Sequence, residues 1–466
     1  MQNGERKIKS KQNIMMRITA DYNQAKLKRY IMSLFKHELV KDTIWTTFLS
    51  VLGKGVGFFI PFFIAAWFGV SSETDAFFFA YGLIIFLATI FSPVVESIIV
   101  PFIAEARAKS EDVGVFVGKV LGISGVSLCI LSIFFMIAIK FVLPYVTRFT
   151  PEGLNLIYII LLESIPLVVL LVWTSVLAGS LNAYKIFSIP ALSPAFRAFM
   201  TLSFIFAFKG LLSIHSIALG YVAGEIFRLG ILLFLLKRLK IIRLKLSLGW
   251  EEKFGNFLKT SSYQLIGMAF LSFTPIINKT MASWLGLGNV SLLEYAERLY
   301  MIPVTLIGSG LLITLLSHWS ERFQIGGTDA LKQDVLKTVK VIGIIGAILS
   351  LLFIFTRYDL VKLAYDHGGF PREKIGAIAS ILGFYFLGLT PSFLSQIYVR
   401  AFLTRKDTKV LLYMAIFMFL STIIFNLAFV KVMGVSGIAL ASSVVNLLAF
   451  IILFFIFSRW SRRTSQ

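Results

Sequence analysis

Apolar segments of about 20 residues recur along nearly the whole chain, and they constrain its fold more than any other feature. A helix needs about 20 apolar residues to cross roughly 30 Å of hydrocarbon. The chain is 57% hydrophobic and only 15% charged over 466 residues, whereas soluble domains are roughly 45–50% apolar. No polar stretch is long enough for a soluble domain. The sequence therefore predicts an all-α polytopic membrane protein.

Charged or Gly/Pro-containing loops separate the apolar segments and predict about twelve transmembrane helices. The expected helices are 43–68, 76–100, 113–143, 154–180, 190–208, 212–236, 256–285, 300–318, 335–356, 375–398, 408–430 and 435–457. The basic connection 237–255 divides them six and six, which is typical of transporters built from two repeats around a central site. We therefore expect an N-terminal lobe over 43–236 and a C-terminal lobe over 256–458.

Basic residues gather in segments that an even number of helices places on one side of the membrane. The first 42 residues carry ten Lys/Arg and a predicted amphipathic interfacial helix, and the linker 237–255 and the tail 459–466 are also basic. The loops 69–75 and 286–297 contain no Lys or Arg. Positive loops stay in the cytoplasm, so both termini are expected there. Anionic lipid headgroups then explain the net charge of +21 better than nucleic acid does.

Lys54 stands near the middle of the first apolar segment, between Gly53 and Gly55. A lysine at the bilayer centre costs about 2.5–3.5 kcal/mol on insertion scales and is therefore usually turned toward a partner, a bundle interior or water. Two interpretations remain open. Lys54 either lines a functional cavity or pairs with a buried acid such as Glu96.

Further charges lie within or beside the predicted helices. Lys279 follows a proline that frees backbone carbonyls, and it faces either a lumen or a helix interface. Glu225 and Arg228 are three residues apart and can neutralise each other on one helix. Glu297 and Arg298 stand at the expected mouth of helix 300–318, as a functional or a plain boundary pair. Plausible bending points, where proline removes an intrahelical hydrogen bond, are Pro61, Pro93 and Pro303.

Signals for catalysis are lacking. The four histidines are scattered without a zinc-binding spacing, so neither a metal site nor a cofactor is expected. The run "GKGVG" (53–57) lacks the P-loop pattern, and the single Cys129 is expected to pack as a small hydrophobic residue. A transporter is favoured over an enzyme. The alternatives are a cation-coupled multidrug antiporter and a scaffold subunit of an envelope-synthesis complex.

Six stretches, in order along the chain, resemble the MviN/MurJ family of lipid II flippases. This family belongs to the larger superfamily that includes polysaccharide-unit flippases and multidrug antiporters. The stretches are "FGVSSETDAFFFAY" (68–81), "SLNAYKIFSIPALSPAFR" (180–197), "LEYAERLYMIPVTLIGSGLLITLLSHWS" (293–320), "LVKLAYDHGGF" (360–370), "VRAFLTRKDTKV" (399–410) and "GVSGIALASSVVN" (434–446).

The resemblance implies two six-helix lobes in a V around a central cationic cavity that works by alternating access. The implied cargo is an undecaprenyl-pyrophosphate-linked glycan, moved from the inner to the outer leaflet of the bacterial cytoplasmic membrane. Lys54 and Arg298 match cavity arginines of the family and would bind pyrophosphate, with Lys279 assisting. Membrane potential or a proton or sodium gradient would drive transport. The expected ion-coupling residues are Glu96, Glu225, Arg228 and Glu297.

The chain also departs from the family pattern. Ile60-Pro61 stands where a second arginine followed by aspartate is expected, and Leu87, Ala88 and Thr89 stand where paired arginines are expected. Usual members also have two helices beyond the twelve expected here. The cargo is therefore left open between lipid II and a polysaccharide repeat unit. Envelope-synthesis machinery is a candidate partner.

Overall fold

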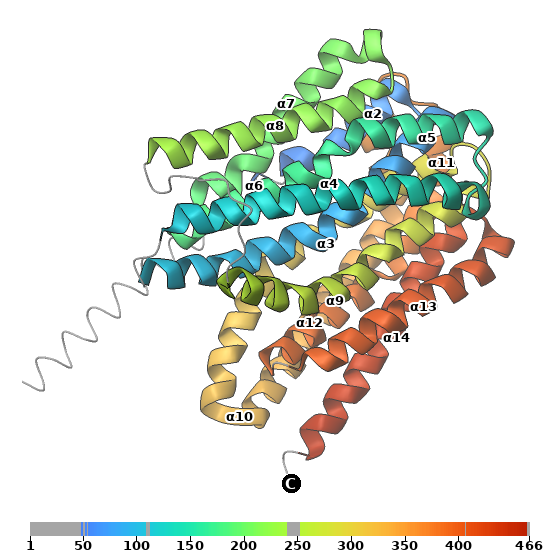
Figure 1. Cartoon of the computed structure of the whole chain (residues 1–466). Helices are drawn as coiled ribbons and strands as arrows, with labels where there is room; N and C mark the ends of the chain where they lie inside the picture. The colour runs from blue at the N-terminus through green and yellow to red at the C-terminus, as the bar shows by residue number, and fades with distance from the viewer. Residues whose placement is uncertain are drawn as a thin grey trace, which may run out of the picture.

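The computed structural model describes residues 48–49, 52–53, 55–108, 112–239, 252–405 and 407–463. Within these ranges the chain is helical apart from short connections (Figure 1). The helices are α2 (Ile60–Phe68), α3 (Ser72–Ala108), α4 (Val113–Val146), α5 (Pro151–Ser164), α6 (Pro166–Ala183), α7 (Ser188–Leu212), α8 (His215–Arg238), α9 (Glu252–Ser283), α10 (Asn289–Tyr365), the 3₁₀ turn η1 (Arg372–Lys374), α11 (Ile375–Leu387), α12 (Leu389–Thr404), α13 (Thr408–Met433) and α14 (Val435–Arg463).

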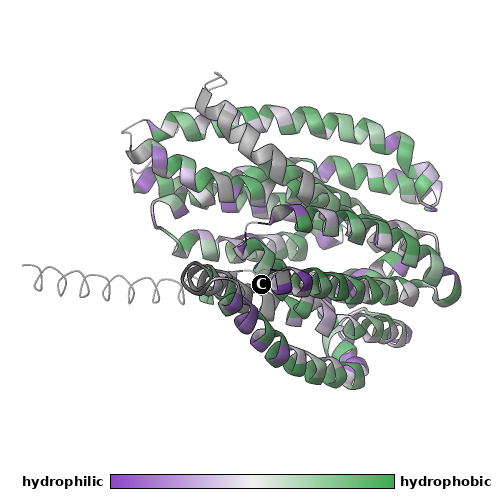
Figure 2. Ribbon diagram, turned by 90° about the horizontal axis from the view of Figure 1, so that it is seen from below, coloured by the Kyte–Doolittle hydropathy of each residue, from purple (hydrophilic) through white to green (hydrophobic). Residues whose placement is uncertain are grey.

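Eight helices of the described part are long and apolar enough to cross a membrane, and the bent pair of η1–α11 with α12 makes a ninth. Hydrophobic residues line these helices along most of their length, as Figure 2 shows. Within the described residues the twelve expected segments fall on helices, but 43–68, 256–285 and 300–318 do not reach the same length and apolarity there. The fold class, an all-α polytopic membrane protein, is confirmed.

Several helices break at glycine or proline. The span of α10 is broken at Gly327, whose φ of 60° is a left-handed conformation. This break separates the expected helices 300–318 and 335–356. α11 and α12 meet at Gly388 with a bend of 41°. Pro61 lies in the first turn of α2, directly after a turn at Phe59. Pro93 and Pro303 lie inside continuous helices, and their role in bending stays a prediction.

The helices form two groups that follow the chain order. In the N-terminal lobe, α3 packs against α5 and α6, and α7 packs along α8. In the C-terminal lobe, α10 packs against α11 and α12, while α13 packs along α14. In Figure 1 the helices α4, α7 and α8 of the first group lie in the upper part, and α12, α13 and α14 of the second lie in the lower part. The main contact between the lobes is α3 against α9.

One end of the molecule joins the lobes through hydrogen bonds, and we call it the closed end. Asp75 of α3 accepts bonds from the backbone N–H groups of Gly288 (2.5 Å) and Ser291 (2.7 Å) and from the Ser291 hydroxyl. Gly288, at φ 85°, is the residue before α10. Asp75 therefore caps the first turn of a helix in the opposite lobe, where unpaired N–H groups and the helix dipole favour a carboxylate.

Further bonds reinforce this closed end. The Tyr295 hydroxyl donates to the Gly69 carbonyl oxygen at 2.8 Å, and the Gly369 N–H donates to the Ala66 carbonyl oxygen at 2.8 Å. The Trp284 indole N–H donates to the Val146 carbonyl oxygen at 2.7 Å. The loops 69–71 and 284–288, which lack basic residues, both lie here.

Cys129 departs from its expected role. It lies on α4 and is exposed, because α4 turns most of its apolar surface away from the rest of the protein. The expectation of a packed cysteine is therefore wrong.

Candidate substrate-binding site

Three charged side chains meet where the lobes join, and we call them the junction cluster. The Lys279 ammonium on α9 lies 2.7 Å from the Glu294 carboxylate on α10. Arg298, one turn further along α10, forms a two-bond ion pair with Glu294 Oε1, at 2.6 Å from one terminal nitrogen and 2.8 Å from Nε. The Glu294 side chain is only 4% exposed, whereas that of Arg298 is 35% exposed.

Lys279 also reaches the opposite lobe. Its Nζ donates to the Phe78 carbonyl oxygen of α3 at 3.0 Å. Gly82, one turn further along α3, makes room for this lysine, because a Cβ atom there would lie 3.1 Å from Nζ. One ammonium group therefore connects α9, α10 and α3.

The three side chains of the junction cluster carry a formal charge of +1, since two cations share one carboxylate, and the neighbouring Glu297 carboxylate lies within electrostatic reach of both cations. Arg298 lies nine residues after Asn289, the start of α10. At 1.5 Å per residue this is about 14 Å, close to half of the roughly 30 Å hydrocarbon thickness. Charges at this depth face the bundle interior and mark pathways for charged substrates.

The structure brings together two of the three predicted substrate-binding residues, Lys279 and Arg298. Sequence reasoning missed Glu294, which joins them, although its spacing of four residues from Arg298 is a helical ion-pair signal. The predicted helix start at 300 is wrong. α10 begins at Asn289, because the cap from Asp75 supports an earlier first turn. Arg298 thus lies within α10. The third predicted substrate-binding residue, Lys54, lies outside the described residues.

Glu297 does not form the expected pair with Arg298, which is bonded to Glu294 instead. Adjacent residues on a helix point in different directions, whereas residues four apart share a face. Glu297 is half-buried and lies near enough to Glu294, Lys279 and Arg298 to interact electrostatically. Its expected role in ion coupling stays a prediction.

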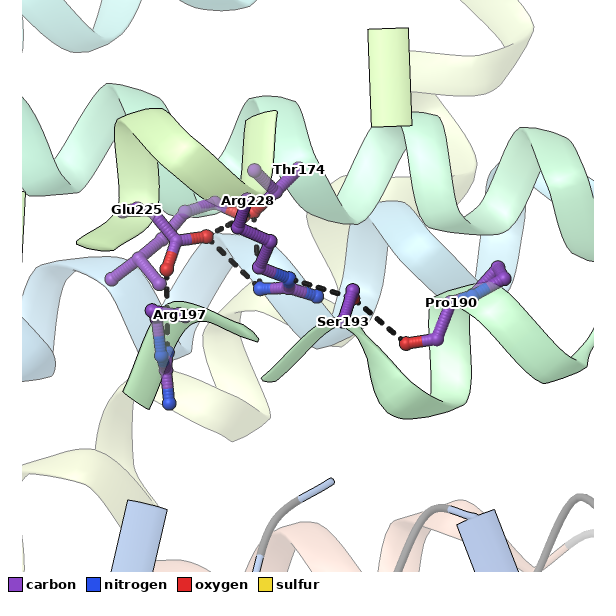
Figure 3. Close-up of polar contacts among 7 residues, drawn as sticks. Thr174, Pro190, Ser193, Arg197, Glu225 and Arg228 are labelled. Atoms are coloured by element: carbon purple, nitrogen blue, oxygen red, sulfur yellow. Dashed lines mark hydrogen bonds and ion pairs between the residues drawn. The ribbon is translucent and has the colours of Figure 1, made fainter. Parts of the chain in front are cut away.

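A second buried cluster lies inside the N-terminal lobe, between α6, α7 and α8, and we call it the N-lobe cluster (Figure 3). Glu225, fully buried, accepts from the Thr174 hydroxyl at 2.6 Å and pairs with Arg228 at 2.9 Å. The predicted neutralisation of Glu225 by Arg228 is confirmed. Arg197 adds a second ion pair at 3.4 Å, which sequence reasoning missed because Arg197 lies on another helix. Glu96, half-buried on α3, acts electrostatically on Arg228.

Neither cluster resembles a metal site. Among the residues that the structure describes, no three His, Cys, Asp or Glu side chains come close enough to hold a metal ion. His215 pairs with Glu163 at 2.9 Å instead.

The fold is shared with solved transporter structures. A lipid II flippase MurJ in an inward closed conformation superposes with a TM-score of 0.73 at 24% identity, covering 90% of this chain and 87% of that one. An inward-facing multidrug resistance MATE transporter gives 0.73 at 15% identity over 90% and 95% of the chains. An outward-facing MATE transporter superposes with a TM-score of 0.62 at 15% identity, covering 91% of this chain and 96% of that one.

Sequence relatives point to one branch of this fold. Probable lipid II flippases MurJ from Buchnera aphidicola subsp. Baizongia pistaciae and Borreliella burgdorferi are 26% and 24% identical over 434 and 430 residues. The alignments cover 89% and 90% of this chain, and 83% of each relative. The family model described as lipid II flippase MurJ matches residues 64–465. The chain therefore belongs to the MurJ family of lipid II flippases.

Proposed function

We propose that this protein flips an undecaprenyl-pyrophosphate-linked glycan precursor from the inner to the outer leaflet of the bacterial cytoplasmic membrane. Membership of the MurJ family supports this class of cargo. The observation that carries the proposal is the junction cluster, where an ammonium and a guanidinium group share one carboxylate about midway along the helices that join the lobes.

Arg298 is the residue of this cluster best placed to receive substrate. Its guanidinium group keeps 35% exposure while it is held by Glu294. A guanidinium group binds phosphate oxygens through two parallel hydrogen bonds, and charge-assisted bonds of this kind are about twice as strong as neutral ones. Lys279 and Lys54 add ammonium groups, Lys54 on the strength of the family resemblance.

The arrangement of the lobes supports alternating access from an inward-facing state. The positive-inside rule puts both termini in the cytoplasm and the closed end outside. The TM-score of 0.73 with an inward-facing MATE transporter, against 0.62 with an outward-facing one, agrees with this orientation. Outward opening would break the bonds of Asp75 to α10 and of Lys279 to Phe78. A central cavity between the lobes would then face each side in turn.

The glycan carried is either lipid II or a polysaccharide repeat unit. Membrane potential or a proton or sodium gradient would supply the driving force. Among the candidate coupling residues, Glu225 is already paired with two arginines, so we favour Glu96 and Glu297 as carriers. The multidrug antiporter and scaffold alternatives are not favoured, since a cationic cluster repels cationic drugs and the family is named for transport.

Complementation of a bacterium depleted of its essential lipid II flippase tests the proposal. The wild type should restore growth, whereas Arg298→Ala and Lys54→Ala, expressed to equal levels in the membrane, should not. Arg372→Ala is the matched control, because the Arg372 side chain is 82% exposed and pairs with Asp366 at the surface. Rescue by all variants would contradict the proposed site. Failure of a well-expressed wild type would exclude lipid II and favour a polysaccharide unit.

A further inference from the structure

The N-lobe cluster holds its two arginines unequally. Arg228 is held on several sides: it pairs with Glu225 at 2.9 Å, donates from Nε to the Ser193 hydroxyl at 2.9 Å, and is within the electrostatic reach of Glu96. Within the described part of the chain, Arg197 makes one ion pair, the longer contact with Glu225 at 3.4 Å. Glu225 is thus neutralised without Arg197.

Arg197 also has unused hydrogen-bonding capacity. Its Nε is buried and has no hydrogen-bond partner among the residues that the structure describes. The side chain as a whole remains 26% exposed, compared with 11% for Arg228. In Figure 3 the Arg197 guanidinium group extends away from Arg228. A buried donor without a partner costs about 1–3 kcal/mol, so such a group is available to a partner from outside the chain, whether water, an ion or a ligand.

Arg197 and Arg298 approach the same pair of tyrosine side chains from different lobes. The rings of Tyr81 on α3 and Tyr221 on α8 lie 4.5 Å apart. Both arginines lie near enough to Tyr81 and Tyr221 to act on them electrostatically. Tyr81 lies nine residues from the start of α3 and Arg298 nine from the start of α10, so the two share a depth. Two guanidinium groups from different lobes therefore lie near one aromatic pair.

The helix that carries Arg197 is fixed in place. A Cβ atom at Gly224 of α8 would lie 2.7 Å from the Arg197 carbonyl oxygen, and one at Gly220 would lie 2.9 Å from Ile205. This small-xxx-small spacing lets α7 and α8 approach closely. The Arg197 guanidinium group also lies near Gly57, where a Cβ atom would be 3.8 Å from a terminal nitrogen. Glycine there leaves the space next to the arginine open.

We propose that Arg197 is a further substrate-binding residue, which binds the pyrophosphate group from the N-terminal lobe while Arg298 binds it from the C-terminal lobe. This inference rests on the proposed function. The substrate exchanges the weak contact of Arg197 with Glu225 for charge-assisted bonds to phosphate oxygens. A site divided between the lobes ties anion binding to their relative position, as alternating access requires.

Binding of undecaprenyl pyrophosphate to the purified full-length protein in detergent tests this inference. Arg197→Gln should weaken binding about tenfold or more, as expected for the loss of charge-assisted hydrogen bonds. Arg197→Lys, which keeps the charge, should recover part of the loss. Lys209→Ala is the matched control on the same helix, because Lys209 lies over the Trp67 ring at 4.6 Å, away from the cluster. It should bind like the wild type.

A double variant separates binding from structure. If Arg197 only balances Glu225, the pair Arg197→Gln with Glu225→Gln should bind like the wild type, and that result would overturn the inference. If Arg197 binds substrate, the double variant binds more weakly than Glu225→Gln alone, which keeps Arg197, at equal amounts of folded protein. Binding that is reduced by Arg298→Ala but unchanged by Arg197→Gln refutes this inference and keeps the proposed function. A wild type that does not bind undecaprenyl pyrophosphate refutes both.

Discussion

Two buried carboxylates, Glu225 and Glu294, each hold two cations, but the helices that they connect differ. Glu225 joins α7 and α8 within the N-terminal lobe and accepts a further bond from α6. Glu294 holds Lys279, whose ammonium group is bonded to α3 of the other lobe. The N-lobe cluster can therefore persist while the lobes move, whereas the junction cluster has to change. A carboxylate that pairs with two cations thus stabilises the N-terminal lobe in the N-lobe cluster, whereas in the junction cluster it responds to the movement of the lobes.

The largest expected loss of stability comes from disrupting the N-lobe cluster, which persists while the lobes move. Glu225→Gln leaves Arg228, whose side chain is 11% exposed, and the less buried Arg197 without their shared carboxylate. Removing one partner of a buried ion pair costs about 3–5 kcal/mol. Unfolding in detergent should show this loss.

Glu163→Gln is the control for this variant, since Glu163 pairs with His215 in the same lobe but both side chains are partly exposed. It should lose much less stability. Equal losses in the two variants would show that burial of the Glu225 site does not matter.

The junction cluster should respond differently to the same change. In Glu294→Gln, Lys279 and Arg298 lose their carboxylate, but separation of the lobes lets them reach water. We expect a smaller loss of stability, about 1.5–3 kcal/mol, together with a larger population of lobe-separated molecules. Distances between spin labels on the two lobes would measure this population. An unchanged distance distribution would contradict the distinction between the clusters.

The smallest of these effects should come from Asp75, which joins the lobes through a helix cap. Asp75→Ala removes the acceptor for the Gly288 and Ser291 N–H groups at the start of α10. Loss of a helix cap costs about 0.5–2 kcal/mol. Because Asp75 caps a helix of the opposite lobe, this loss destabilises the state in which the closed end is joined. The same spin-label distances should shift toward separated lobes.

Asp112→Ala is the matched control for the cap. Asp112 caps α4 within one lobe, where it accepts from the Gly114 N–H at 2.9 Å. Its loss should lower stability to a similar degree and leave the lobe distances unchanged. If both variants shift the distances equally, Asp75 has no special role in closing the lobes.

The fold was largely predictable from the sequence, because apolar length and loop charge are local properties. The ends of the helices were less predictable from the sequence. α10 begins earlier than expected, because Asp75, which caps it, comes from another part of the chain. The exposed Cys129 shows the same limit, because an apolar segment does not reveal which face turns to lipid.

About half of the residues in the two charged clusters were predictable from the sequence. Lys279 and Arg298 stood out as charges in apolar surroundings, and the i,i+3 pairing of Glu225 with Arg228 followed from helix geometry. Glu294 and Arg197 did not stand out, since their roles depend on helices that meet only in three dimensions.

The most direct test of the central claim is lipid flipping in proteoliposomes. The protein would be reconstituted with a fluorescent undecaprenyl-pyrophosphate-linked glycan, and chemical quenching from outside would report its movement between leaflets. Wild type should flip the lipid, and Arg298→Ala at equal reconstitution should be about tenfold slower or worse, as expected for loss of a charge-assisted contact. Equal rates, or no flipping of any such lipid by the wild type, would contradict a flippase that binds pyrophosphate at the lobe junction.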